Sequence, residues 1–228
     1  MQSLSKRLET IASLVPDGAR VCDVGTDHGY LSAFLKLSGK VNTVIAADIN
    51  KGPLENAAAN FKKFSITDIE LRLCDGLSGF KEHEIDTIVI AGMGGEVITG
   101  ILKRGESIAK IKTKTIILQP TTSPEILRKY LYKNGFEIIK DIPVFENDKI
   151  YSVMQVCYTG KAVEKDEYFF YCGLVDFNMP EGLLYIKKQY NRCLSCKNSL
   201  KNVKIKQAEY EYYSNLVKDI QTNYDLGE

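Results

Sequence analysis

The stretch Val21-Cys-Asp-Val-Gly-Thr-Asp-His-Gly-Tyr30 decides the fold of this 228-residue chain. It begins with the apolar residues of a strand and leads into residues 30–37, where apolar side chains recur at helical spacing. Gly25 and Gly29 lie in the turn between them. Glycine lets the backbone turn sharply there and approach a ligand at the end of the strand. The stretch therefore predicts a strand–turn–helix unit with a ligand site at the turn.

Strand-like and helix-like segments alternate along the chain from this unit to residue 135. Strands are predicted at residues 20–24, 43–47, 69–73, 87–90 and 115–118, and helices at residues 4–15, 30–37 and 53–64. Ser123-Pro124 predicts an N-cap and a first turn for one more helix, which Gly135 ends. This alternation predicts a parallel sheet with right-handed crossovers and with helices on both faces.

The pattern changes after Gly135. Residues 136–142 and 150–157 are predicted strands joined around Asn147-Asp148, which favours an antiparallel hairpin at the end of the sheet. Beyond Gly160, apolar residues recur at spacings of three, four or seven. They are Ile186, Tyr190, Cys193, Leu200, Val203, Tyr210, Tyr213, Val217 and Ile220. This spacing predicts two helices packed as a hairpin, in a second and smaller unit.

Composition restricts the class of protein. The 30 basic and 29 acidic residues nearly balance, so overall charge does not indicate a nucleic-acid-binding protein. The six cysteines are dispersed, which favours reduced thiols and a cytoplasmic location. Cys193 and Cys196 have no second pair or nearby histidine, so we expect core packing and no metal site. No apolar run has the length of a signal peptide core or a membrane span, so we expect no membrane association.

Asp27 decides which cofactor the glycine turn predicts. A dinucleotide would place its pyrophosphate over a glycine at this position. A carboxylate would repel the pyrophosphate but would attract the ammonium and sulfonium groups of S-adenosylmethionine. We therefore predict S-adenosylmethionine as the cofactor. His28, in the same turn, is more typical of a local hydrogen-bonding residue than of a catalyst. The predicted cofactor-binding residues of the turn are Asp23, Gly25, Thr26, Asp27, His28, Gly29 and Tyr30.

Three later strand ends extend the predicted site. Asp48 is placed to accept hydrogen bonds from ribose hydroxyls, and Asp75 from an adenine amino group, although Asp75-Gly76 also fits a simple turn. The glycines of Ala91-Gly-Met-Gly-Gly95 leave space for a substrate base. No Asn/Asp-Pro-Pro-Tyr motif follows this strand, which disfavours methylation of an exocyclic amine. The cofactor-binding residues predicted here are Asp48, Ile49, Asn50, Asp75, Gly76, Ala91, Gly92 and Met93.

Five motifs carry a resemblance to a known family. They are Leu4-Ser-Lys-Arg-Leu8, Asp23-Val-Gly-Thr-Asp-His-Gly-Tyr-Leu31, Asp75-Gly-Leu77, Ala91-Gly-Met-Gly-Gly95 and Leu118-Gln-Pro120. Residues 1–158 resemble the bacterial tRNA (adenine-22-N1)-methyltransferase family, with a weaker helical match to the end. The resemblance implies an α/β fold: a Rossmann-like, seven-stranded methyltransferase sheet in residues 1–160 and a coiled-coil-like α-helical hairpin domain in residues 161–228. It also implies tRNA as the partner and methyl transfer from S-adenosylmethionine to N1 of adenine-22.

Local charge in the second unit favours the same partner. Residues 187–206 contain seven basic side chains and no acidic one. Lys188 with Arg192, and Lys197 with Lys201, would share a helix face suited to phosphates, although such faces also occur on solvated helices. The predicted substrate-binding residues are Arg7, Tyr30, Met93, Gly94, Gly95, Lys188, Arg192, Lys197 and Lys201.

The expected chemistry needs no strong base, because the lone pair of adenine N1 is free in an unpaired base. Catalysis would depend on alignment in a water-poor site. The methylated base is cationic, so Asp27 is the predicted catalytic residue that stabilises the developing charge. The alternatives are a methyltransferase of another acceptor, a non-catalytic module that binds S-adenosylmethionine or tRNA and, more remotely, a nicotinamide-dependent oxidoreductase. A monomer is the default expectation.

Overall fold

A mixed sheet of seven strands organises residues 19–158 in this computed structural model, which describes residues 4–201, 203–224 and 226. The strands are β1 (Ala19–Val24), β2 (Val41–Asp48), β3 (Glu70–Leu73), β4 (Thr87–Gly94), β5 (Thr115–Thr122), β6 (Phe136–Glu146) and β7 (Lys149–Tyr158). Their order is β3-β2-β1-β4-β5-β7-β6. Strands β1 to β5 are parallel, β7 is antiparallel to β5, and β6 is antiparallel to β7. The predicted seven-stranded Rossmann-like sheet is confirmed.

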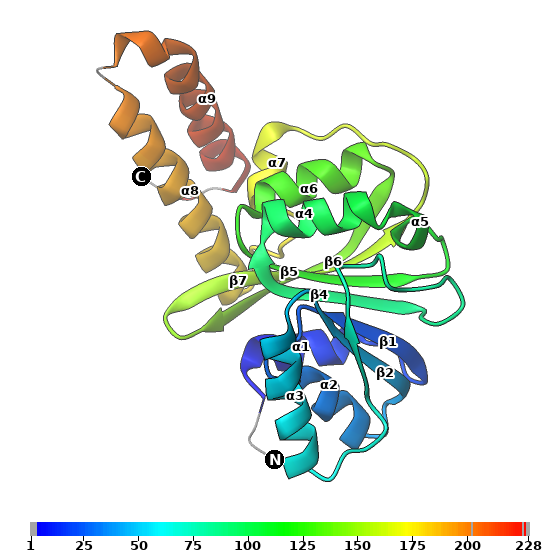
Figure 1. Cartoon of the computed structure of the whole chain (residues 1–228). Coiled ribbons are helices and arrows are strands. Elements are labelled where there is room, and N and C mark those ends of the chain that lie inside the picture. Colours follow the sequence, from blue (N-terminus) through cyan, green and yellow to red (C-terminus); the bar gives the residue numbers. More distant parts are fainter. Residues whose placement is uncertain (1–3, 202, 225, 227–228) are drawn as a thin grey trace.

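Helices cover both faces of the sheet (Figure 1). The helices on the two faces are α1 (Lys6–Leu14), α2 (Tyr30–Leu37), α3 (Lys51–Lys63), α4 (Gly95–Arg104), α5 (Glu106–Ala109) and α6 (Pro124–Lys133). Alternate strand residues face opposite helices: Val21 packs with α1 and α2, and Cys22 packs with α4 and α6. The strands therefore have apolar residues on both faces, as expected for a parallel sheet covered on both sides.

The hairpin between β6 and β7 follows the prediction. Asn147 and Asp148 have φ values of 49° and 58°, and the flanking residues Glu146 and Lys149 are paired. Two successive positive φ angles are the requirement of a type I′ turn, which matches the twist of an antiparallel pair. Strand β6 extends four residues beyond its predicted range, and β7 extends one residue at each end.

Ser123 occupies the predicted N-cap position of α6, but it does not cap the helix with its side chain. Pro124 does begin the helix, but Ser123 has a left-handed backbone (φ 50°, ψ 47°) and its side chain makes no capping hydrogen bond. The backbone of Ser123 is instead packed against the start of α4, because a Cβ at Gly95 would lie 2.2 Å from the Ser123 carbonyl oxygen. This close packing of two helix starts is not visible in the local sequence.

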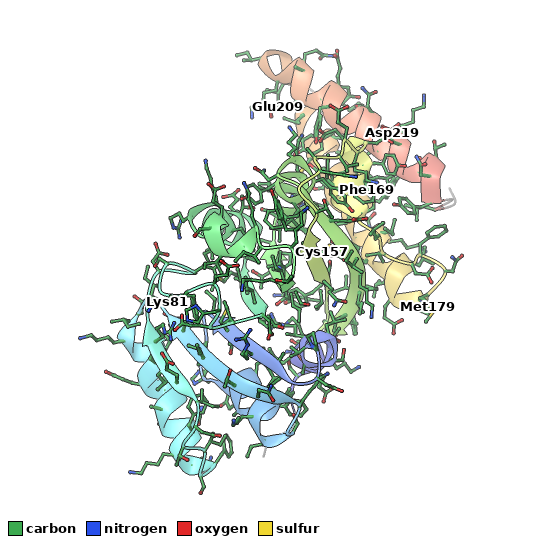
Figure 2. The ribbon with its side chains drawn as sticks, turned by 90° about the vertical axis from the view of Figure 1, so that its right-hand side faces the viewer. Lys81, Cys157, Phe169, Met179, Glu209 and Asp219 are labelled. Atoms are coloured by element: carbon green, nitrogen blue, oxygen red, sulfur yellow. The ribbon has the colours of Figure 1, made fainter. Side chains whose placement is uncertain are left out.

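The remaining helices are α7 (Glu167–Cys172), α8 (Pro180–Leu200), the short 3₁₀ helix η1 (Lys204–Lys206) and α9 (Gln207–Tyr224). Helices α8 and α9 lie side by side as a helical arm that projects from the sheet (Figure 1). In Figure 2 the arm extends from the region of Met179 to that of Glu209, on the side of the molecule opposite Lys81. The predicted helical hairpin is confirmed, and Cys193 packs in its core.

Val203 was predicted to continue the apolar face of the first arm helix, and this is wrong. It lies between α8 and η1 with 41% of its surface exposed, because α8 ends at Leu200. Among the described residues, no helix is both long and apolar enough to cross a bilayer.

Arg128 of α6 joins the sheet, α7 and the arm. Its guanidinium is fully buried and forms an ion pair with Asp141, at 3.0 Å from Nη2 to Oδ2. It also donates to the carbonyl oxygens of Phe170 and Tyr171 and to the Tyr185 hydroxyl, at 2.9–3.0 Å. Burial alone would lower the pKa of Arg128, but Asp141 and Tyr185 raise it, so the side chain stays charged.

Candidate cofactor and substrate site

A cavity of about 530 Å³ opens at the carboxyl ends of β1, β4 and β5. Parallel strands place their carboxyl ends at one edge of a sheet, which is the usual ligand site of this architecture. The cavity brings together eleven of the predicted site residues: Arg7, Asp23, Gly25, Thr26, Asp27, His28, Gly29, Tyr30, Ala91, Gly92 and Met93.

The turn after β1 requires its glycines. Gly25 and Gly29 have φ values of +80° and +67°, in the left-handed region that favours glycine. A Cβ at Gly29 would lie 2.6 Å from the Phe61 ring, and one at Gly25 would lie 1.9 Å from the end of the Met93 side chain. The backbone amides of residues 25 and 26 both donate to the Ala47 carbonyl oxygen, which ties the turn to the end of β2. A larger residue at position 29 would collide with Phe61, and one at position 25 would displace the end of the Met93 side chain.

Asp23 is the buried carboxylate at the base of the cavity. Its Oδ2 accepts hydrogen bonds from the hydroxyls of Thr26 at 3.0 Å and Ser32 at 2.7 Å. Burial raises the pKa of Asp23, and the two hydroxyl hydrogen bonds oppose that shift. No hydrogen bond among the described residues uses its Oδ1, so that oxygen is available to a ligand.

Asp27 and His28 lie at the open side of the cavity. The Asp27 side chain is 77% exposed, and its Oδ2 lies 3.5 Å from Nε2 of His28. The His28 ring stacks on Tyr30 with centroids 5.5 Å apart, and the His28 carbonyl accepts from Asn60 Nδ2 at 2.9 Å. His28 therefore has the local contacts expected of a structural residue, while the Asp27 carboxylate faces solvent and ligand.

The cavity also contains five residues that the sequence interpretation missed: Leu8, Leu31, Gln119, Thr121 and Tyr151. Gln119 is fully buried, and its Oε1 accepts from Nη1 of Arg7 at 2.9 Å and from the Gly92 amide at 3.1 Å. A glutamine at the end of an apolar strand was the available signal, because a buried amide needs partners. Tyr151 gave no such signal, since β7 reaches the cavity only through its pairing with β5.

Two acidic residues, Asp48 at the end of β2 and Asp75 after β3, do not line the cavity. Asp48 ends the strand next to β1, and its Oδ1 accepts from the Asn50 amide at 2.8 Å, while the neighbouring Ile49 is exposed. Asp75 is paired with Arg104 at 2.9 Å, and Gly76 has a left-handed backbone beside Ile101. The ribose and adenine contacts assigned to these residues stay predictions.

The predicted substrate residues fall into separate groups. Gly94 and Gly95 pack against the end of β5 and the start of α6 and do not line the cavity. Lys188 and Arg192 line a smaller, adjoining cavity, whereas Lys197 and Lys201 lie farther along the arm and outside both cavities. The basic face predicted for the second unit is therefore divided into two parts.

A mixed sheet of this order, with a glycine turn after β1 and acidic residues at the end of that strand and in the turn, defines a Rossmann-like methyltransferase. A family model described as "Methyltransferase domain" matches residues 4–154, and the chain belongs to this family.

Three relatives narrow the assignment within this family. The chain is 38% identical over 152 residues to the tRNA (adenine(22)-N(1))-methyltransferase of Bacillus subtilis, a match that spans 66% of this chain and 63% of that protein. Sp1610 of Streptococcus pneumoniae, a putative tRNA (m1A22) methyltransferase solved with S-adenosyl-L-methionine, has a TM-score of 0.82 and 28% identity, covering 96% of this chain and 99% of its own. M. capricolum TrmK with S-adenosyl-homocysteine has a TM-score of 0.81 and 26% identity, covering 98% of both chains. The resemblance to the bacterial tRNA (adenine-22-N1)-methyltransferase family is thereby confirmed.

Proposed function

We propose that this chain transfers a methyl group from S-adenosylmethionine to N1 of an adenine, adenine-22, in tRNA. The observation that carries the proposal is the single cavity formed by the turn of residues 25–29 and the strand end at residues 91–93. Two structures solved with the cofactor or its product match this chain over nearly its whole length, which supports the same use of the cavity here.

The residues of the turn fit the cofactor. The positive φ angles of Gly25 and Gly29 turn the backbone sharply at the end of β1, so that main-chain groups of the turn line the cavity and lie close to a bound ligand. Asp23 and Asp27 supply carboxylates for the ammonium group of the amino acid moiety. When bound, S-adenosylmethionine supplies an electrophilic methyl group on a sulfonium.

The residues around the acceptor position suit a base that is already nucleophilic. Adenine N1 needs no deprotonation, so the protein must hold the base unpaired, orient it and exclude water. Tyr30 and Met93 provide an aromatic and an apolar surface against which such a base can stack. Asp27 places a negative charge beside a ring that becomes cationic, which stabilises the transition state more than the ground state.

The helical arm offers a second set of contacts for a large substrate. Lys197 of α8 and Lys201, directly after its last residue, lie outside both cavities on an arm that projects from the sheet. Lysine side chains on such an arm suit the phosphates of a folded RNA that reaches beyond the cavity. We assign them to tRNA positioning rather than to chemistry.

The test is methylation of unmodified tRNA transcripts with tritiated S-adenosylmethionine, followed by nucleoside analysis. We expect labelled 1-methyladenosine with a transcript that has adenine at position 22, and none with a matched transcript that has guanine there. Label in another nucleoside would identify a different acceptor. Cofactor binding without label in any tRNA would favour a non-catalytic binding module.

A further inference from the structure

A second cavity of about 300 Å³ adjoins the first one. It lies between the end of β5, the start of β7 and helix α8, and both cavities are lined by Thr121 and Tyr151. A volume of this size is at the small end of ligand pockets and suits one nucleotide base. We call it the flanking pocket.

Gln189 is the feature of the flanking pocket that points to a ligand. Its side chain lines the pocket and is only 2% exposed, and within the described part of the chain its Oε1 has no hydrogen-bond partner. Buried amide oxygens are nearly always paired, because an unpaired one loses its hydrogen bonds to water without replacement. The oxygen is covered in the free protein, so the amide group must rotate to present it to an occupant of the pocket with an N–H donor.

Cations from both cavities meet at Tyr151. The guanidinium carbon of Arg7, in the first cavity, lies 5.1 Å from the centroid of the Tyr151 ring. Nζ of Lys188, in the flanking pocket, lies 5.6 Å from the same centroid and donates to the Ile150 carbonyl oxygen at 2.7 Å. Arg7 is paired with Glu146 at 3.2 Å, so Lys188 is the cation at this boundary that suits a phosphodiester passing from one cavity to the other.

The charges around Lys188 leave it in need of an anion. Burial lowers the pKa of Lys188, and the neighbouring cations Arg192 and Lys149 lower it further. The Glu125 carboxylate is paired with Arg192. A phosphate beside Lys188 would stabilise its charged form.

We propose that the flanking pocket binds a nucleotide directly adjacent to the methylated adenosine, with Gln189 accepting a hydrogen bond from the base and Lys188 contacting the linking phosphate. The proposal rests on the function proposed above and adds a specificity determinant to it. The enzyme would then read one base beside its target and hold the backbone between the two bases.

The first test replaces Gln189 with methionine, which has a similar volume but no amide oxygen. The control is Gln207→Met, the same change at an exposed position of α9. We expect Gln189→Met to raise KM for tRNA roughly fivefold or more, the effect of losing one buried hydrogen bond, while kcat stays within about twofold. The Kd for S-adenosylmethionine and the melting temperature should not worsen, because the replaced oxygen has no partner in the free protein.

Transcripts with an altered neighbour make the test specific. Each base adjacent to the target is replaced by purine ribonucleoside, which lacks an exocyclic amine. At one of the two positions we expect the replacement to raise KM for wild-type enzyme and to have no further effect on Gln189→Met, as for two groups that form one contact. Equal effects on both enzymes at both positions would overturn the proposal.

A second variant covers the case in which Gln189→Met does not fold. We expect Lys188→Met to weaken tRNA binding and to reduce the slope of log Kd against log salt concentration by about one. An unchanged slope would overturn the phosphate contact. If wild-type enzyme does not methylate tRNA, the proposed function itself fails. If wild-type enzyme methylates tRNA and both variants have the KM and salt slope of wild type, only the proposal about the flanking pocket is refuted.

Discussion

Arg7 of the first helix donates a hydrogen bond of 2.9 Å to Gln119, a residue 112 positions later in the chain. The same Gln119 oxygen accepts from the backbone amide of Gly92, and Arg7 is also paired with Glu146. Helix α1 therefore holds the wall of the cavity on which the predicted acceptor base would lie. The contact connects three elements that are remote in sequence, α1, β4 and β5.

Replacing Arg7 with methionine should lower activity and stability together. The change leaves Glu146 without its cation and removes one of the two donors to Gln119. We expect kcat/KM for tRNA to fall at least about tenfold and the free energy of unfolding to drop by about 1–3 kcal/mol, measured by urea denaturation. Lys6→Met, at an exposed position of the same helix, is the control and should change neither value. Wild-type activity in Arg7→Met would show that this network does not organise the site.

Asp27→Asn separates two roles of one carboxylate. If Asp27 only attracts the cofactor, its loss should raise the Kd for S-adenosylmethionine and leave turnover at saturation unchanged. We expect kcat to fall at least about tenfold, clearly more than the cofactor affinity does, because the charge also stabilises the cationic ring. Asp17→Asn, at another exposed acidic residue, controls for net charge. Losses of the same size in both quantities would contradict the catalytic role.

Cofactor affinity should depend on pH through Asp23. Burial raises the pKa of this carboxyl, so it becomes protonated at a higher pH than an ordinary aspartate. Only the ionised form attracts an ammonium group, so the Kd for S-adenosylmethionine should increase as pH falls through the raised pKa. Calorimetry between pH 8 and pH 5 measures this dependence. In Asp23→Asn, we expect weaker binding with much less pH dependence, and an unaltered pH profile would exclude Asp23 as the titrating group.

The arm lysines should affect affinity but not chemistry. In the double variant Lys197→Ala/Lys201→Ala, we expect weaker tRNA binding and a salt slope reduced by about one per lysine. The matched control is Lys62→Ala/Lys63→Ala at exposed positions of α3. Turnover at saturating tRNA should be unchanged in both. A salt slope equal to that of wild type would show that the arm lysines only contact solvent.

Sequence periodicity predicted the fold well because each strand and helix has its own pattern of apolar residues. The hairpin of β6 and β7 was predictable from Asn147-Asp148, whose backbone preference is local. Ser123 was misjudged because its conformation depends on Gly95, a residue 28 positions earlier that packs against its carbonyl. Val203 was misjudged because the end of a helix is less regular than its middle.

The lining of the cavity was predictable where one loop supplies several of its residues, as in residues 23–30. The cavity lining was less predictable where the wall comes from strands that meet only in the folded sheet. Gln119 and Tyr151 belong to this second group, and their roles depend on distances that the chain order does not encode. Lys188 and Arg192 were expected on one face with Lys197 and Lys201, but the first pair lines the flanking pocket and the second pair lies beyond it, at the far end of α8.

The buried guanidinium of Arg128 limits how this protein can be divided or recombined. Three of its hydrogen-bond acceptors, on Phe170, Tyr171 and Tyr185, belong to residues after position 160, while the arginine itself belongs to the sheet layer. Truncation near position 160 would remove these acceptors together with the helices that bury the guanidinium, and would leave Asp141 as its partner in the sheet layer. A chimaera that keeps this sheet must therefore receive C-terminal helices that bring equivalent carbonyl and hydroxyl groups. Exchange of these helices between relatives is thus restricted by an interior charge rather than by the surface that meets the substrate.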